Sequence, residues 1–113
     1  QLALALEAAG DETGALARYE QCLALKPDYA EAHFARGLLL EKRSRRGEAI
    51  DAYRRASEAS PAFAPAHLAL GAALEKEGRT DEAVEHVRRA MQLAPGDPTS
   101  RQLLDRLTKE VAP

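Results

Sequence analysis

Two histidines, His33 and His67, occupy matching positions in two copies of a sequence repeat and are the first residues to test for metal chemistry. Zinc binds imidazole nitrogens at about 2.0–2.1 Å, so two ligands of one ion must lie close together. Equivalent positions on neighbouring packed helices are about 8–10 Å apart. We therefore expect no metal at this pair, and we expect both side chains to fill large positions at the edge of a core.

The other potentially reactive side chains do not indicate a catalytic site. A single cysteine allows no internal disulfide, and Cys22 falls in the same column as Ala56 and Ala90, which predicts a small buried residue. His86 lies among charged residues and is expected to be exposed. The sequence contains no Ser–His–Asp set, phosphate loop or paired-carboxylate motif. We predict a chain that is not an enzyme and that uses no cofactor.

Glutamates recur once per repeat at Glu7, Glu41 and Glu75, and we call this set the acidic ladder. Lysines follow two of them directly, at Lys42 and Lys76. One carboxylate per unit in an open groove lacks the burial that shifts catalytic pKa values. Two interpretations have equal weight: the ladder attracts a basic ligand, or its Glu–Lys pairs form a solvated face worth about 0–1 kcal/mol per pair.

The charge pattern argues against nucleic acid and membrane partners. The basic stretch 42–46 is the best nucleic-acid candidate, but 18 acidic residues are interleaved with 16 basic ones and the net charge is −2. No apolar run approaches the roughly 18–20 residues of a membrane span. There is no signal-peptide pattern, which slightly favours the cytoplasm and otherwise leaves localisation open. An excess of Arg over Lys and the absence of Asn favour a bacterial source.

The chain repeats itself with a period of about 34 residues, which is within the range typical of helical arrays. Residues 30–63 and 64–97 align without a gap and are identical at nearly half of their positions, including Gly37 with Gly71 and Pro61 with Pro95. Stacked units of this kind usually hold other molecules rather than transform them.

Apolar spacing and regular Gly and Pro breaks predict that every segment is helical. The expected helices cover residues 1–9, 11–25, 29–43, a segment from the polar break 44–47 to Pro61, 65–77, a segment from Thr80 to Pro95, and 98–110. Asp28, Thr80 and Asp97 are candidate N-caps, and Gly78 is a candidate turn residue. Gly37 and Gly71 lie inside helices, so we expect them to allow close approach of a second helix.

These residues resemble the tetratricopeptide repeat (TPR) family, a helix–turn–helix unit of about 34 residues. The matching columns are His33, Arg36, Gly37, Leu40, Ala49, Tyr53, Ala56 and Pro61, then His67, Leu70, Gly71, Leu74, Ala83, Val87, Ala90 and Pro95. An earlier unit keeps Leu2, Ala3, Leu6, Ala15, Tyr19, Cys22 and Pro27. The resemblance implies an all-α, right-handed superhelical array of antiparallel helix pairs. It would be one domain, residues 1–113, with a partial repeat 1–29, repeats 30–63 and 64–97, and a capping helix 98–110.

The resemblance also implies a function, because this family binds peptides or proteins in a concave groove lined by the first helix of each unit. The groove residues would be Leu4, Glu7, Glu31, Phe34, Leu38, Glu41, Lys42, Pro65, Leu68, Ala72, Glu75, Lys76, Gln102 and Arg106. We expect a non-catalytic interaction or scaffolding module whose partner is an apolar protein segment with basic flanks. The positions that clamp chaperone carboxylates in this family are Leu4, Ala35, Leu38, Pro65 and Ala69 here. None of these side chains donates a hydrogen bond, so we do not expect that ligand.

Two other functions stay open. The chain would be the interaction arm of a larger enzyme or of a secretion or assembly protein, with the chemistry outside these residues. Alternatively, the apolar residues Leu2, Leu4 and Leu6 of the incomplete first unit would support self-association into a homo-oligomer.

Overall fold

Residues 12–111 are described by the computed structural model, and they form six α-helices and no strand. The helices are α2 (Glu12–Leu25), α3 (Ala30–Lys42), α4 (Arg46–Ala59), α5 (Ala64–Lys76), α6 (Thr80–Leu93) and α7 (Pro98–Val111). The all-α prediction is therefore confirmed. The expected helix over residues 1–9, and with it Leu4 and Glu7, lies outside the described residues.

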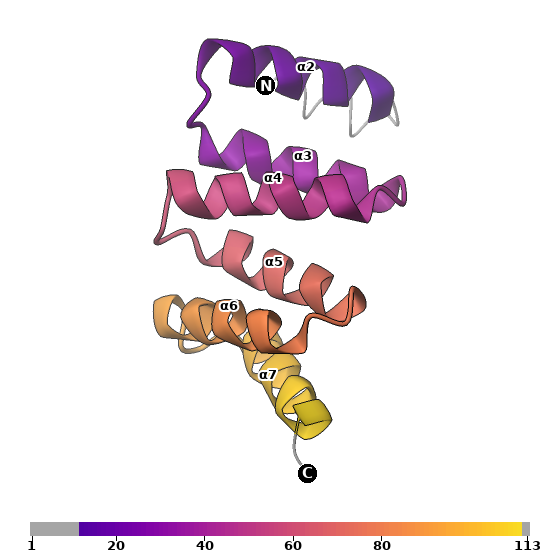
Figure 1. The fold of residues 1–113 in the computed structure, drawn as a ribbon. Helices are drawn as coiled ribbons and strands as arrows, with labels where there is room; N and C mark the ends of the chain where they lie inside the picture. The colour runs from indigo at the N-terminus through magenta and orange to yellow at the C-terminus, as the bar shows by residue number, and fades with distance from the viewer. Residues whose placement is uncertain (1–11, 112–113) are drawn as a thin grey trace.

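The helices form an elongated stack in chain order, from α2 at one end to α7 at the other (Figure 1). Each described helix packs against the next one in the sequence, and α5 also contacts α7. In Figure 1, α4 lies in front of α3 and α6 lies in front of α7. No described helix has the length and apolar character required to span a membrane.

Small and branched apolar side chains form the core between successive helices. The main cluster joins α3 to α7 and contains Leu40, Ala49, Ile50, Ala52, Tyr53, Leu70, Ala73, Leu74, Ala83, Val87, Leu103 and Leu107. A second cluster joins α2 to α3 through Ala15, Tyr19, Ala32 and Leu39. Apolar residues recur at helical spacing on each segment, so every helix buries one face against its neighbours.

Glycines allow α3 to approach α4 closely and α5 to approach α6 closely, as the sequence predicts. A Cβ atom at Gly37 would lie 2.5 Å from Cε1 of Tyr53, and a Cβ atom at Gly71 would lie 2.5 Å from Cγ2 of Val87. Both distances are far below van der Waals contact. Each glycine lowers helix stability by about 1 kcal/mol relative to alanine, and close packing of the facing helix explains why glycine is present despite this cost.

The turn between α3 and α4 and the turn between α5 and α6 each contain one residue with a positive φ angle, but the residue type differs. Gly78 has φ 78°, as expected for a turn glycine, and Ser44, at the same place in the preceding unit, has φ 62°. The predicted break 44–47 is wrong at its end, because Arg46 already begins α4.

The helix caps agree with the predictions only at α7. There the Asp97 carboxylate accepts hydrogen bonds from the Thr99 N–H at 3.1 Å and the Ser100 hydroxyl at 3.0 Å. The proposed caps at Asp28 and Thr80 are wrong, because the chain enters α3 and α6 one residue away. Tyr29 and Arg79 hold the cap positions without a side-chain hydrogen bond.

Candidate functional site

An apolar pocket of about 350 Å³ opens between α3, α5 and α7. Six of the predicted groove residues line it together: Phe34, Pro65, Leu68, Ala72, Gln102 and Arg106. Ala69, Thr99 and Leu103 complete the lining. Its volume falls within the roughly 300–1,000 Å³ of ligand sites in proteins.

Three helices position this lining through their spacing. Leu68 and Ala72 are four residues apart on α5, so they share one face, and Phe34 approaches that face from α3. The Phe34 ring packs edge-on against Phe63, with centroids 5.4 Å apart, and against Tyr53 at 5.9 Å. Phe34 therefore lines the pocket wall and also packs against the core.

Two members of the acidic ladder, Glu41 and Glu75, form ion pairs between neighbouring helical units. The Glu41 carboxylate lies 3.7 Å from Nζ of Lys76 and accepts a hydrogen bond from the Tyr53 hydroxyl at 2.5 Å. Burial, and then this hydrogen bond, raise the pKa of Tyr53 above its usual range. Glu75 accepts two hydrogen bonds from the Arg106 guanidinium, at 2.9 and 2.6 Å. These ion pairs join α3 to α5 and α5 to α7, so the two carboxylates already have partners within the protein.

The remaining predicted groove residues lie around the pocket rather than in it. Leu38 is 44% exposed on α3 and does not line the pocket. Glu31 and Lys42 are exposed near the two ends of α3.

The sequence did not predict Thr99 and Leu103 as groove residues, and it placed Ala69 on the groove only as a position of the family's carboxylate clamp. Thr99 lies one turn before Gln102 on α7, and Leu103 directly follows Gln102. Ala69 directly follows Leu68 on α5. Extending the predicted face by one turn of each helix would have found them.

Two histidines meet between α5 and α6, although the sequence predicted that His86 is exposed. His67 and His86 have their Nδ1 atoms 3.3 Å apart, with ring planes inclined by 23°. The Nε2–H of His67 donates to the carbonyl oxygen of Pro61 at 2.9 Å, so its neutral Nδ1 accepts from His86. Burial, and then the electrostatic effect of the His67 ring, lower the pKa of His86.

The structure gives these side chains packing roles. His33 and His67 are buried, 6% and 8% exposed, as expected for large positions at the core edge. Within residues 12–111, no group of three or more His, Cys, Asp or Glu side chains is placed to hold a metal ion. Cys22 packs against the α2–α3 cluster but is partly exposed, unlike the buried Ala56 and Ala90 of the same column.

Solved structures resemble this fold over nearly the whole chain. The MamA RS-1 ArsTM double mutant is 25% identical, with a TM-score of 0.86 over 97% of this chain, which spans 62% of that protein. The first TPR of Spaghetti (RPAP3), bound to the HSP90 peptide SRMEEVD, is 16% identical with a TM-score of 0.91, covering 98% and 88% of the two chains. The Arabidopsis OM64 TPR domain is 22% identical with a TM-score of 0.88, covering 96% and 90%.

Family models agree with the structural likeness, although no protein of curated function matches the sequence. A tetratricopeptide repeat model matches residues 39–98, and a TPR repeat model matches residues 3–44. The chain belongs to the tetratricopeptide repeat family.

Proposed function

We propose that this chain is a non-catalytic module that binds a peptide or protein segment by receiving an apolar side chain between α3, α5 and α7. The observation that carries the proposal is the pocket of about 350 Å³ whose walls include Phe34, Leu68 and Ala72. Exposed apolar concavities on proteins are typical of interaction sites. The family supports binding as the class of function.

The charges around the pocket refine the ligand. Glu41 and Glu75 are paired with Lys76 and Arg106, so basic ligand residues would have to compete with these cations. Apolar contact therefore supplies most of the affinity in this proposal, and basic flanks add to it only by displacing a protein cation. Ligand ordering opposes binding, so we expect micromolar rather than nanomolar affinity.

One solved relative binds the HSP90 peptide SRMEEVD, and that peptide serves as a negative control here. Leu38, Pro65 and Ala69 hold the groove positions at which the family's carboxylate clamp needs hydrogen-bond donors. An acidic tail would lose its water at these side chains without gaining a partner. We expect the acidic peptide not to bind.

The test combines selection with calorimetry. Random dodecapeptides displayed on phage are selected against the folded chain, and a selected peptide is titrated into the chain and its variants. We expect the selected peptides to share an apolar residue. Ala72→Arg, which places a long charged side chain at the pocket, should weaken binding at least about tenfold, or 1.4 kcal/mol.

Glu58→Ala is the matched control, because Glu58 is exposed on α4 and does not line the pocket. Circular dichroism verifies that both variants fold. Equal affinity of the wild type and Ala72→Arg for every selected peptide would overturn the proposal.

A second candidate function concerns the parent protein. The chain spans 62% of the MamA structure, which is consistent with one part of a longer protein. In that case the module would be the arm that recruits a partner, and any enzymatic activity would belong to other segments. Activity assays on the full-length protein, with and without Ala72→Arg, would separate recruitment from chemistry.

A further inference from the structure

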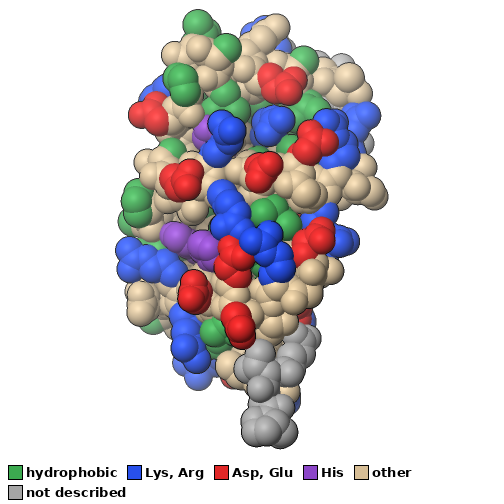
Figure 2. Space-filling view, in the orientation of Figure 1, with side chains coloured by type: hydrophobic (Ala, Val, Ile, Leu, Met, Phe, Trp, Pro, Cys, Tyr) green, Lys and Arg blue, Asp and Glu red, His purple; other side chains and the backbone are tan. Residues whose placement is uncertain are grey.

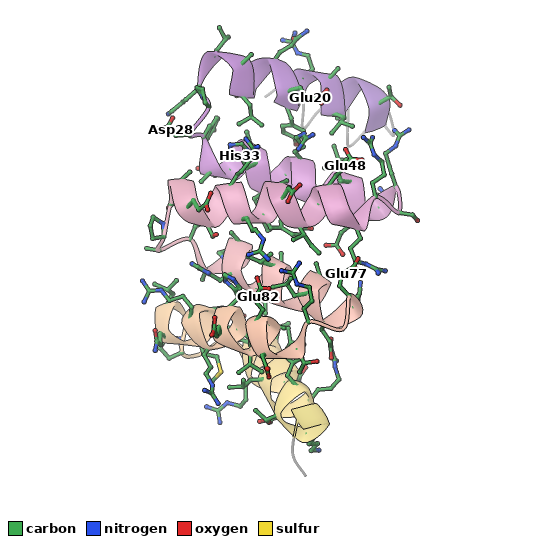
Figure 3. All side chains as sticks on the ribbon, in the orientation of Figure 1. Glu20, Asp28, His33, Glu48, Glu77 and Glu82 are labelled. Atoms are coloured by element: carbon green, nitrogen blue, oxygen red, sulfur yellow. The ribbon has the colours of Figure 1, made fainter. Side chains whose placement is uncertain are left out.

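A second pocket, of about 420 Å³, lies between α2, α3 and α4, and it shares no residue with the groove. Its lining is Glu20, Leu23, Pro27, His33, Arg36, Glu48, Asp51 and Arg55. Figure 3 shows Glu20 on α2, His33 on α3 and Glu48 on α4. Basic and acidic side chains intermix over this face of the molecule (Figure 2).

His33 is one of the residues that line this pocket, and its ring carries a buried acceptor without a partner in the described part of the chain. Its Nε2–H donates to the carbonyl oxygen of Pro27 at 2.7 Å, because a carbonyl only accepts. The neutral ring then carries a lone pair on Nδ1, which is buried and has no hydrogen-bond partner in the described part of the chain. A buried acceptor without a partner is unfavourable, so this nitrogen favours a ligand that donates a hydrogen bond.

The next pair of units shows how the same position is satisfied. His67 is held in the same way, with its Nε2–H on Pro61, and its Nδ1 faces His86. In the earlier unit the residue that corresponds to His86 is Ala52, which has no side-chain donor.

The two interfaces also differ in an ion pair. Arg54 of α4 forms a hydrogen-bonded ion pair with Glu82 of α6. The corresponding residues of the preceding units are Glu20 and Glu48, so at the first interface a carboxylate replaces the guanidinium. An imidazole donor and a guanidinium are therefore both missing at the pocket, while the His33 acceptor that an imidazole satisfies in the next unit is retained without a partner.

The acceptor capacity that the lining leaves for a cation lies on Asp51 and Glu20, because the third carboxylate, that of Glu48, is already bound by Arg45. Glu20 lies 3.8 Å from Arg36, a long ion pair, and Glu48 is bound by Arg45 outside the lining. Asp51 is exposed, and within residues 12–111 its carboxylate forms no ion pair or hydrogen bond.

We infer that this pocket binds the guanidinium group of an arginine side chain from a partner protein, which donates hydrogen bonds to His33, Asp51 and Glu20. A planar guanidinium presents several N–H donors and matches carboxylates in pairs, which a compact ammonium does not. The occupant would give His33 the donor that His86 gives His67, and it would bring a guanidinium to this interface, as Arg54 does at the next one. The site lies apart from the groove, so a partner could contact both surfaces at once.

The experiment uses N-acetylarginine amide as the probe. The chain contains three histidines, so ring ¹⁵N–¹H correlation spectra report on His33 while His67 and His86 serve as internal references. We expect a saturable, millimolar shift of the His33 ring signals with little change at the other two. N-acetylcitrulline amide, which has nearly the same shape without the charge, should give no saturable shift.

Two variants locate the site. Asp51→Asn keeps the shape of an exposed side chain and should weaken arginine binding about threefold or more, as expected for loss of one charged contact. Ala52→His supplies the donor seen at His86 and should abolish binding, with folding verified by its melting curve. If Ala52→His does not fold, Asp51→Asn remains decisive.

The inference is overturned if the His33 signals do not shift, or if citrulline shifts them equally. It is also overturned if Asp51→Asn binds arginine as tightly as the wild type, because the acceptors that define the pocket would then play no part. Retained groove-peptide binding in Asp51→Asn would show that the two sites are separate.

Discussion

Arg106 of α7 donates two hydrogen bonds to the carboxylate of Glu75 on α5, from Nε at 2.9 Å and from Nη2 at 2.6 Å. The Glu75 side chain is only 14% exposed, whereas that of Arg106 is 61% exposed. Arg106 therefore contributes both to this ion pair and to the lining of the groove pocket. This pair fixes the last helix over the groove that it helps to form.

The Glu75–Arg106 pair should show measurable coupling. In a double-mutant cycle of Glu75→Gln and Arg106→Gln, we expect a coupling free energy of about 0.5–1 kcal/mol, because bidentate geometry raises the pair above the usual surface value. Urea unfolding of the four proteins gives this number, and 1 M salt should reduce it. A coupling of zero at low salt would mean that α7 is held by apolar packing alone.

Gly71 should tolerate no large side chain. Gly71→Leu forces its side chain into Val87 and toward the carbonyl oxygen of Ala83, 3.2 Å from the Cβ position, so we expect a loss of about 2–3 kcal/mol in unfolding free energy. Gly47→Ala is the control, because nothing lies within 4 Å of that position on α4, and it should gain about 0.5–1 kcal/mol. Equal melting temperatures for the two variants would contradict close helix approach at Gly71.

A glycine in the turn between α3 and α4 should stabilise the protein. Ser44 has φ 62°, a left-handed conformation that costs a residue with a Cβ atom about 1 kcal/mol, so Ser44→Gly should raise the unfolding free energy by about that amount. Gly78→Ser makes the reverse change in the equivalent turn and should lower it similarly. Thermal melts of both variants test this. A destabilised Ser44→Gly would show that the Ser44 side chain has another role.

His86 should make stability depend on pH. Its folded pKa is lowered, first by burial and then by His67, with Arg54 lowering it and Glu82 and Glu85 raising it. A group whose folded pKa lies below its unfolded value, about 6.5, binds more protons when unfolded. The unfolding free energy should therefore fall as pH decreases below about 6.5.

His86→Gln keeps a donor for His67 but does not titrate, so it isolates this effect. The difference in unfolding free energy between wild type and His86→Gln should shift against the wild type between pH 7.5 and pH 5.5. A difference that is constant over this range would refute the assignment. Glu82, whose pKa is lowered chiefly by its hydrogen bond with Arg54, acts only at lower pH and does not confuse the comparison.

The structure is most predictable from the sequence where one period governs it. The repeat predicted the helices and the close approach at Gly37 and Gly71, because both depend on local spacing and on small residues in fixed columns. It also brought together Phe34, Leu68 and Ala72. Helix ends were less predictable: Asp28 and Thr80 are acceptable caps chemically, but the chain enters each helix one residue away.

Side-chain partners across helices could not be predicted from spacing alone. The acidic ladder suggested Glu–Lys pairs within one helix, whereas Glu41 pairs with Lys76 of the next unit and Glu75 with Arg106 of α7. His86 was expected to be exposed because its sequence neighbours are charged. In the structure His86 contacts His67 of another helix, with the two Nδ1 atoms 3.3 Å apart. The sequence pattern along one helix does not predict such a contact between helices.

The central claim is that the groove across α3, α5 and α7 receives the ligand. Chemical-shift mapping of the ¹⁵N-labelled chain with a display-selected peptide tests it most directly. We expect the largest amide shifts to cluster at Phe34, Leu68 and Ala72, with small shifts on the charged sides of α4 and α6. Shifts concentrated on α4 and α6, with the groove amides unchanged, would contradict it.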